Sequence, residues 1–287
     1  MKNITTLIFA LGMTVSALAS VSPAEKNALV KLYNNTNGAA WTNKWDIKAP
    51  VEKWYGVKVL NDKVVGIDLS NNNLTGELPK EIGNLTSLQS LNLFRNNISG
   101  KLPASIGNLK FLKTMNLGFN KLTGPIPSAV GNMVSLQSLE LYMNRLNGTL
   151  PEEIGNLASL QTLSLFNNEI EGEIPSSFYN LKNLKVLLLS SNKLSGKLSI
   201  DIDKMASLEN LSLFENNMVG QVPFSLEKLK NLKEMNISYN KFNGLVSRNL
   251  AQLDMMNMTM INDKGVATAL QVESNTRSTS ALAAEDE

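Results

Sequence analysis

The sequence of 287 residues contains neither histidine nor cysteine. The absence of histidine excludes an imidazole general base, a Ser-His-Asp triad and a histidine metal ligand. The absence of cysteine excludes a thiolate nucleophile, a zinc site built on thiolates and any disulfide. An active site would have to use carboxylates, lysine, tyrosine or serine alone, which excludes most hydrolase chemistry. We therefore expect neither a metal site nor a cofactor.

Charge is also scarce. Only 18% of the residues are charged, and 27 Lys and Arg against 25 Asp and Glu leave a net charge of +2 without a basic cluster. Because phosphate binding requires a clustered basic face, we expect no nucleic-acid partner. The hydrophobic content of 43% is typical of a soluble, folded chain.

The N-terminus has the pattern of an export signal. Met1-Lys2-Asn3 precedes an apolar run over 4–18, and Ala17-Leu18-Ala19 closes it. A positive start, an apolar middle and an A-x-A site predict a signal peptide over 1–19. The alternative is a membrane anchor, but the run is shorter than the ~20 residues that a spanning helix needs. No later stretch is apolar enough to span a bilayer, so we expect a protein that is secreted or held in the cell envelope.

The rest of the chain repeats with a period of 24 residues. Leucine recurs at this spacing seven times, and Val64 opens the same register one repeat earlier, which gives eight repeats over 64–255 without insertion or deletion. We number each repeat from this residue as position one. The seven leucines are Leu88, Leu112, Leu136, Leu160, Leu184, Leu208 and Leu232.

Three other positions of the repeat are nearly invariant within the chain. Position nine is asparagine and position thirteen is glycine in all eight repeats, and position sixteen is proline in all but two, which carry Ser199 and Ser247. The asparagines are Asn72, Asn96, Asn120, Asn144, Asn168, Asn192, Asn216 and Asn240. An asparagine amide can pair backbone groups buried where the chain reverses, and we expect it also to bond to its counterpart in the next coil.

The apolar pattern predicts a solenoid. Apolar residues at positions one, four and six place the inner face of a short strand toward a shared core, while positions three and five point outward. One coil cannot bury its own apolar face, so the repeats must stack. At ~4.8 Å per strand, eight coils give a parallel sheet of roughly 38 Å.

The repeat pattern LxxLxLxxNxLxGxIPxxIGNLxx resembles the plant-specific class of leucine-rich repeats. Ile106-Gly107-Asn108-Leu109 and Ile154-Gly155-Asn156-Leu157 match it closely, and the likeness covers roughly 64–255. This class occurs in the ectodomains of plant receptor kinases, in polygalacturonase inhibitors and in secreted bacterial proteins. The resemblance implies an α/β-type solenoid: a right-handed coil with a concave parallel β-sheet that binds ligand.

Residues 20–63 are predicted to form an N-terminal cap. Ser22 is placed as a helix N-cap with Pro23 in the first turn and Glu25 three residues on, before an apolar helix that extends to Tyr33. Three tryptophans, Trp41, Trp45 and Trp54, follow. Terminal repeats need covers, so we interpret the tryptophans as packing on the first repeat; the alternative is a platform for a sugar ring.

Trp54-Tyr55-Gly56-Val57 resembles the W-x-G-V segment of plant caps. That family places a cysteine pair there, and its absence here favours a bacterial source.

Residues 256–287 are predicted to be the remnant of a C-terminal cap and a disordered tail. Methionines 255, 256, 258 and 260 form an apolar group suited to covering the last coil. From about Ala267 the chain is rich in Ser, Thr and Ala and ends Glu285-Asp286-Glu287, a composition typical of disorder.

Large side chains gather at positions seven and eight, which we predict to be outward positions beside each strand. Exposed rings often mark binding sites, so we predict that this stripe contacts the ligand. The alternative is lateral packing, in which rings of consecutive coils stack and stiffen the sheet edge. Gly118, Ser190 and Ser238 interrupt the stripe, as a purely structural ladder would not require. The predicted ligand-binding residues are Phe94, Arg95, Phe119, Tyr142, Met143, Phe166, Phe214 and Tyr239.

An enzyme would have to use paired carboxylates. A glycosidase needs two carboxyl groups about 5 to 9.5 Å apart. Asp68 and Glu140 lie three strands apart, about 14 Å, and Glu215 and Glu234 are near 16 Å apart along their strands. The remaining acidic residues gather around Glu169, and Lys193 flanks them. Solvated ion pairs are enough to explain why these charges lie together. We predict that the protein is not an enzyme, with a carboxylate glycosidase as the enzymatic alternative.

Together these observations predict an exported, monomeric, non-enzymatic protein that recognises a ligand on the concave face of its solenoid. By likeness to inhibitors and receptor ectodomains the ligand is a protein, with a glycan as the alternative. A function from another class is a structural or adhesive component of the cell envelope that self-associates through the edges of its repeats.

Overall fold

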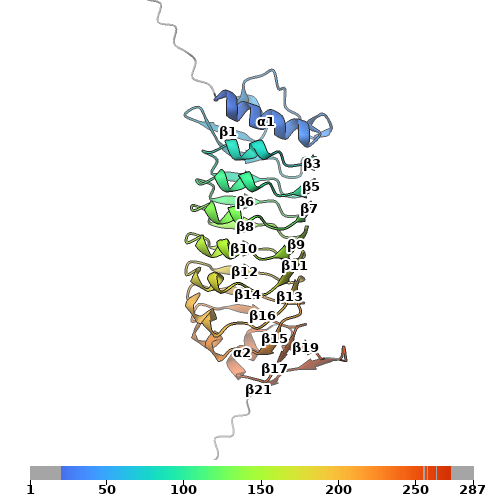
Figure 1. Ribbon diagram of the computed structural model, residues 1–287, viewed down its shortest axis with the longest axis vertical. Helices are drawn as coiled ribbons and strands as arrows, with labels where there is room; N and C mark the ends of the chain where they lie inside the picture. The colour runs from blue at the N-terminus through green and yellow to red at the C-terminus, as the bar shows by residue number, and fades with distance from the viewer. Residues whose placement is uncertain (1–20, 255, 257, 263, 273–287) are drawn as a thin grey trace, which may run out of the picture.

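The computed structural model describes residues 21–254, 256, 258–262 and 264–272. The predicted signal peptide, Met255 and the segment 273–287 lie outside the described residues. The described chain is a stack of coils with a helix, α1 (Pro23–Asn35), at one end and strand β21 (Gln271–Val272) at the other (Figure 1). The predicted fold class, a leucine-rich-repeat solenoid, is confirmed.

The helix α1 begins as the sequence predicts and extends two residues further than expected, to Asn35. The Ser22 hydroxyl accepts from the backbone N–H of Glu25 (3.3 Å) and donates to its carboxylate (2.7 Å). The other oxygen of that carboxylate accepts from the backbone N–H of Val64 (3.1 Å). Glu25 is only 3% exposed, so one buried, hydrogen-bonded side chain ties the cap helix to the first repeat.

The three tryptophans pack beneath α1. Trp41, Trp45 and Trp54 are at most 4% exposed, and each indole N–H donates to a backbone carbonyl. Trp45 stacks on Trp54 with ring centroids 4.8 Å apart. Rings buried in this way have no free face for a sugar, so the packing interpretation holds and the sugar platform is wrong.

One wall of the stack is a nine-stranded sheet. An antiparallel hairpin of β1 (Val57–Leu60) and β2 (Lys63–Asp68) opens it, and every later strand joins in parallel, exactly one repeat apart in the sequence, as in the pairing of Leu91 with Met115. The later strands are β4 (Ser90–Asn92), β6 (Thr114–Asn116), β8 (Ser138–Glu140), β10 (Thr162–Ser164), β12 (Val186–Leu188), β14 (Asn210–Ser212) and β16 (Glu234–Asn236).

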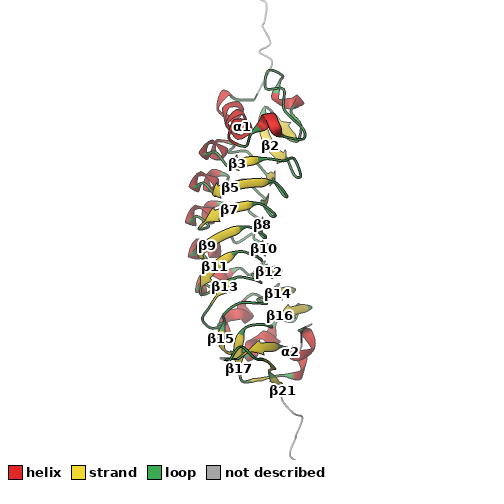
Figure 2. Ribbon diagram, turned by 90° about the vertical axis from the view of Figure 1, so that its right-hand side faces the viewer, coloured by secondary structure: helices red, strands yellow, loops and turns green. Residues whose placement is uncertain are grey.

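A second, six-stranded parallel sheet forms an adjoining wall. Figure 2 shows its strands stacked beside a row of short helices that runs along one side of the molecule. Its strands are β3 (Thr75–Glu77), β5 (Asn97–Lys101), β7 (Lys121–Gly124), β9 (Arg145–Thr149), β11 (Glu169–Gly172) and β13 (Lys193–Leu194).

The short helices are 3-10 turns, one in each of the first seven repeats; the eighth repeat has the α-helix α2 (Arg248–Leu253) in their place. They are η3 (Lys80–Asn84), η4 (Ala104–Asn108), η5 (Ser128–Asn132), η6 (Glu152–Asn156), η7 (Ser176–Asn180), η8 (Ile200–Lys204) and η9 (Phe224–Lys228); the cap adds η1 (Gly38–Ala40) and η2 (Val51–Lys53). Proline precedes most of them, and its fixed φ suits the entry to a helical turn. Where serine replaces proline, its hydroxyl caps the turn: Ser199 accepts from Asp201 N–H, and Ser247 accepts from Leu250 N–H.

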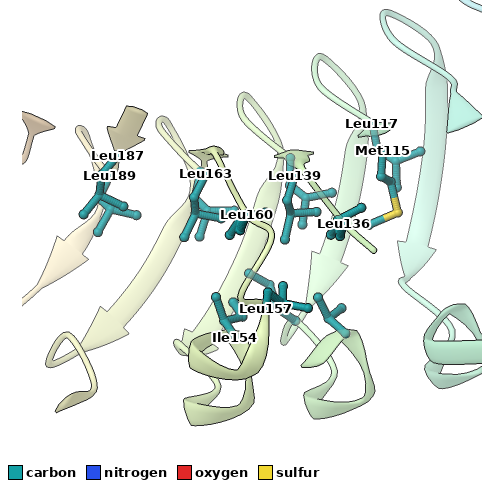
Figure 3. Close-up of a cluster of buried hydrophobic side chains, with 14 of the residues drawn as sticks. Met115, Leu117, Leu136, Leu139, Ile154, Leu157, Leu160, Leu163, Leu187 and Leu189 are labelled. Carbon is teal, nitrogen blue, oxygen red and sulfur yellow. The ribbon is translucent and has the colours of Figure 1, made fainter. Parts of the chain in front are cut away.

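The apolar positions of the repeat fill the space between these walls. Met115, Leu139, Leu163 and Leu187, at position four of consecutive coils, line up behind the nine-stranded sheet (Figure 3). Ile154 and Leu157 fill the core from the side of the 3-10 helices (Figure 3). All these side chains are at most 2% exposed.

The asparagines at position nine pair buried backbone groups, as the sequence predicts, but they bond to their counterparts at only one step among the described residues. The Asn168 carbonyl oxygen accepts from Leu146 N–H (3.0 Å), and its amide donates to the carbonyls of Leu141 (3.1 Å) and Leu165 (2.9 Å). The amide therefore pairs backbone groups of its own and the preceding coil. The expected bond between counterparts occurs at the first step, where the Asn72 backbone N–H donates to the Asn96 side-chain oxygen (3.1 Å). Within the described residues, no bond joins the side chains of two successive asparagines, because the buried backbone groups already use their amides.

The C-terminal end corrects the prediction of disorder from Ala267. After α2 (Arg248–Leu253), β19 (Thr259–Ile261) pairs with β20 (Ala267–Ala269), and β21 pairs with β18 (Leu245–Val246). A further parallel pair joins β15 (Val219–Gln221) and β17 (Lys241–Asn243). Residues 267–272 are mostly apolar, unlike the residues that follow, and backbone pairing places them in strands β20 and β21. Met258 and Met260 are buried, as expected of a cover, whereas Met256 is 39% exposed.

Candidate ligand-binding surface

The predicted binding residues lie in the turn that follows each strand of the nine-stranded sheet. From β4 on, the strands cover positions three to five only, so positions seven and eight lie beyond the end of each strand and not, as expected, beside it. The reason is the backbone at position eight, which is left-handed in every repeat, with φ between 51° and 58°. Backbone bonds between coils nevertheless continue through the turn: Met143 N–H donates to the Phe166 carbonyl at 2.8 Å.

The left-handed backbone makes some side chains at position eight unusual. Asparagine tolerates a positive φ, as at Asn167, whereas large side chains seldom adopt it. Phe119 and Tyr239 do adopt it, with φ of 54° and 58°. Bulky rings held in a disfavoured conformation are characteristic of functional sites.

Four rings from four consecutive coils form one continuous group, which we call the aromatic cluster: Phe94, Phe119, Tyr142 and Phe166. Ring centroids are 5.5 Å apart between Phe94 and Phe119, and 5.8 Å apart between Phe119 and Tyr142. Tyr142 stacks on Phe166 at 4.7 Å with 8° between the planes. These distances lie in the range of favourable aromatic pairs.

Gly118 does not interrupt this cluster, contrary to the sequence interpretation. A methyl group on Gly118 would lie 2.8 Å from the Tyr142 ring, so the ring covers the glycine. The missing side chain makes room for a neighbouring ring.

The aromatic cluster both packs internally and faces solvent. Phe119 is 43% exposed, and the other three rings are half-buried. Lateral stacking therefore contributes to the arrangement, as the packing interpretation holds, and an apolar surface remains available for contact as well.

A polar network borders the cluster. The Glu140 carboxylate accepts from the Asn116 amide (3.1 Å) and from the Ser138 hydroxyl (2.9 Å). Burial raises the pKa of Tyr142, and the Glu140 charge raises it further, while a hydrogen bond with Asn116 opposes the shift. The neutral phenol thus presents a hydroxyl beside a carboxylate, a pair able to bind polar or cationic groups of a ligand.

The remaining predicted residues lie around or beyond the cluster. Arg95 is exposed and Met143 is half-buried, each at the left-handed position of its turn. Phe214 and Tyr239 form a second aromatic pair, with centroids 5.2 Å apart. The eight predicted residues therefore separate into two groups, divided by a repeat with Ser190 at position seven.

The acidic side chains considered for a catalytic pair bond to separate polar partners. The Ser70 hydroxyl donates to Asp68 within one coil, whereas Glu215 and Glu234 accept from Ser191 and Asn210 of the preceding coil. Lys193 and Glu169 form an ion pair at 2.9 Å that is about half exposed, the solvated contact that the sequence predicts. Among the described residues, no three Asp or Glu side chains gather closely enough to hold a metal ion.

Sequence reasoning missed two features of this surface. The hydrogen bonds of Glu140 escaped notice because its partners come from the same strand and from the preceding coil, and only the strand register relates them. Ser164 is the second, with a hydroxyl that is buried and unpaired within the described part of the chain. Its outward position in the repeat gave no signal of burial.

Comparison with known proteins places the chain among repeat proteins. Residues 67–147 and 141–271 match the family model of a leucine-rich repeat region. The chain is similar to the plant peptide hormone receptor RGFR1, solved in complex with RGF2, at 33% identity and a TM-score of 0.64. That match covers 72% of this chain and 32% of the receptor.

Two further structures are similar. One is the ectodomain of the membrane receptor kinase GASSHO1/SCHENGEN3 from Arabidopsis thaliana, in complex with CASPARIAN STRIP INTEGRITY FACTOR 2: identity 28%, TM-score 0.58, covering 79% of this chain and 34% of that chain. This chain thus spans about a third of the length of the two receptors. The other, a plant ice-binding protein, shares the fold at 23% identity and a TM-score of 0.55, covering 89% of this chain and 99% of that one. Within the described residues, no helix has the length and apolar character to cross a membrane.

Proposed function

The chain belongs to the leucine-rich repeat family, and from this premise we propose that it is an exported, non-enzymatic protein that binds a protein ligand through the aromatic cluster. The observation that carries the proposal is the continuous cluster of rings with Phe119 at its exposed centre. Two similar receptor structures, solved in complex with RGF2 and with CASPARIAN STRIP INTEGRITY FACTOR 2, support a protein over a glycan as the ligand.

The proposal includes an organisation of the chain and a place of action. A signal peptide over 1–19 directs export, 20–63 cap the solenoid, 64–255 form eight repeats, and 256–287 close the C-terminal end. The protein acts as a monomer, secreted or held in the cell envelope, and the missing cysteine pair of the plant caps favours a bacterial source. Arg95, Met143, Phe214 and Tyr239 extend the contact surface beyond the cluster.

The test begins with a library of extended peptides displayed on phage and panned on the exported chain. Peptides that are enriched are then titrated calorimetrically against the native chain and the triple variant Phe94→Ala, Tyr142→Ala, Phe166→Ala. Because fully desolvated aromatic anchors dominate binding energy, we expect the triple variant to bind at least about a hundredfold more weakly. Envelope polysaccharides, titrated in parallel, test the glycan alternative.

The matched control is Phe111→Ala. Phe111 is 63% exposed and lies outside the aromatic cluster, so its loss removes an equally apolar ring elsewhere. Thermal unfolding verifies that all variants remain folded. Equal binding by the native chain and the folded triple variant would overturn the proposal.

A specific observation supports the alternative of self-association. Ile200 and Phe224, at the same position of consecutive coils, are 71% and 47% exposed where η8 and η9 begin. Exposed neighbouring apolar side chains can mediate contact between copies. Sedimentation of the pure protein across a range of concentrations distinguishes the two functions. We expect a monomer at every concentration. If the native chain assembles and Phe224→Ser abolishes the assembly, a structural role is favoured.

A further inference from the structure

The column of rings at position seven, which we call the ladder, is interrupted twice between Phe94 and Phe214, at Gly118 and at Ser190. Phe166 and Phe214 occupy this position two repeats apart, and Ser190 lies between them. The backbone around Ser190 keeps the same register as its neighbours, because Asn167 N–H donates to the Ser190 carbonyl (2.9 Å) and Ser191 N–H donates to the Phe214 carbonyl (2.8 Å). A hydroxymethyl group therefore stands where the flanking coils carry rings.

The width of this vacancy matches one planar group. Tyr142 and Phe166, one coil apart, stack at 4.7 Å, which is close to the strand spacing of ~4.8 Å. Two coil steps separate Phe166 from Phe214 by about 9.6 Å, beyond the reach of direct ring contact. A flat group midway would lie about 4.8 Å from each ring, a favourable stacking distance.

The earlier gap in the ladder is closed by the protein itself. At Gly118 the Tyr142 ring covers the space that a side chain would fill, and Phe119 packs against it. At Ser190 no ring takes this role: position eight of the same coil is Ser191, and no aromatic pair links Phe166 with Phe214 within the described chain. Among the described residues, no ring pair closes the second gap.

The repeat geometry also identifies a third wall. A ring at position seven contacts position eight of the next coil, as in Phe94 with Phe119 (5.5 Å) and Phe214 with Tyr239 (5.2 Å). For a group above Ser190 the corresponding residue is Glu215. One oxygen of the exposed Glu215 carboxylate accepts from the Ser191 hydroxyl at 2.6 Å, which leaves the other oxygen for a ligand.

We propose that this slot, formed by Phe166, Phe214, Ser190 and Glu215, binds an arginine side chain of the protein ligand. A guanidinium is planar and cationic, stacks on aromatic faces, and donates to carboxylates at its edge. Charge complementarity supports the assignment: positions three, five, seven and eight of the eight repeats carry Asp68, Glu140, Glu215 and Glu234 against Arg95 alone. The proposal rests on the proposed function and names the chemistry of its ligand.

The test uses three capped pentapeptides with two glycines on each side of arginine, citrulline or lysine. Saturation-transfer NMR measures their binding to the exported chain. We expect arginine to bind best, because citrulline keeps the plane without the charge and lysine keeps the charge without the plane. A loss of about tenfold for either analogue is the scale of a cation–π contact or an exposed charged hydrogen bond.

Two variants locate the binding. Ser190→Phe completes the ring ladder with a residue that other repeats carry at this position, so it should fold and abolish arginine binding. Glu215→Gln should reduce arginine to the level of citrulline. Its matched control is Glu234→Gln, which removes one negative charge from strand β16, in the coil that follows Glu215. Because Glu234 is not a wall of the slot, this variant should bind the arginine peptide as the native chain does.

Each outcome supports or overturns the slot. Failure of the native chain to bind the arginine peptide, or equal binding by the folded Ser190→Phe variant, overturns it. Phe119→Ala separates the two proposals, because Phe119 belongs to the aromatic cluster and is not a wall of the slot. A ligand selected from the library that depends on Phe119 but tolerates Ser190→Phe would leave the proposed function intact and refute the slot. If Ser190→Phe abolishes arginine binding but no selected ligand depends on Phe119, the slot is supported and the proposed function is refuted.

Discussion

The asparagine at position nine stabilises each turn through the backbone groups that it pairs. Asn168 is 8% exposed and bonds to one N–H and three carbonyl groups. These groups would be left without partners beside the core if the amide were removed. A buried polar group without a partner is destabilising, and this outweighs any helix or strand preference at a single position.

We therefore predict that Asn168→Ala lowers the free energy of unfolding by about 2–4 kcal/mol. Denaturation in urea measures the loss. The control is Asn147→Ala, an exposed asparagine on strand β9, for which a change within about 0.5 kcal/mol is expected. Equal effects of the two substitutions would contradict the role assigned to the amide.

Tyr142 shows how the aromatic cluster changes the chemistry of one residue. Desolvation raises its pKa, and the neighbouring Glu140 carboxylate adds to the effect. Because folding raises this pKa, the neutral phenol contributes stability that is present below the pKa of the unfolded chain. That stability is lost as the pH rises through the folded value.

We predict that Tyr142 ionises at a higher pH in the folded protein than in the unfolded chain. Titration of tyrosine carbons by NMR resolves the individual rings. Glu140→Gln should lower the pKa of Tyr142 without restoring it to the ordinary value, since desolvation is the larger cause. An unchanged Tyr142 titration in this variant would show that the carboxylate has no influence on the phenol.

At the scale of elements, the 3-10 helices stack closely where position twenty is glycine. A methyl group on Gly131 would lie 2.4 Å from the carbonyl oxygen of Glu153 in the next helix, and Gly107 has the same relation to Ala129. Tyr179 takes this position in η7. Its hydroxyl accepts from Ser199 N–H at 3.2 Å, a donor that the proline of other repeats lacks. The departures from the repeat at Tyr179 and Ser199 thus complement each other.

We predict that Gly131→Ala destabilises the protein by about 1–3 kcal/mol, because the overpacked methyl group forces two helices apart. The better helix propensity of alanine, worth up to about 1 kcal/mol, opposes this loss and is the smaller effect. Urea unfolding measures it, with the exposed Asn132→Ala of the same helix as the control. A stabilised Gly131→Ala variant would show that propensity dominates over spacing.

At the scale of the whole molecule, the sequence predicts the solenoid because each coil buries apolar residues at the same positions of the repeat. The period places Met115, Leu139 and Leu163 at one depth in the core, and the strand register follows from that period. The sequence-based predictions fail where the structure depends on contacts that the repeat pattern does not encode. The left-handed turn at position eight and the filled gap at Gly118 depend on neighbouring coils, and the strands over 267–272 depend on pairing with the last coil.

The proposed binding surface was predictable in part for the same reason. Periodicity assigns Phe94, Tyr142 and Phe166 to one column, but ring orientation is decided by side-chain packing between coils. Periodicity alone therefore locates the candidate surface without separating the aromatic cluster from the pair of Phe214 and Tyr239.

The central claim is that a protein ligand binds on the aromatic cluster, and photo-crosslinking tests it most directly. Benzoylphenylalanine is placed at position 119 or at position 111, both of which carry an exposed phenylalanine in the native chain. The chain is then irradiated with the ligand selected from the peptide library. We predict crosslinking from position 119 and none from position 111. Crosslinking from position 111 alone, by a chain that remains folded, would contradict the account.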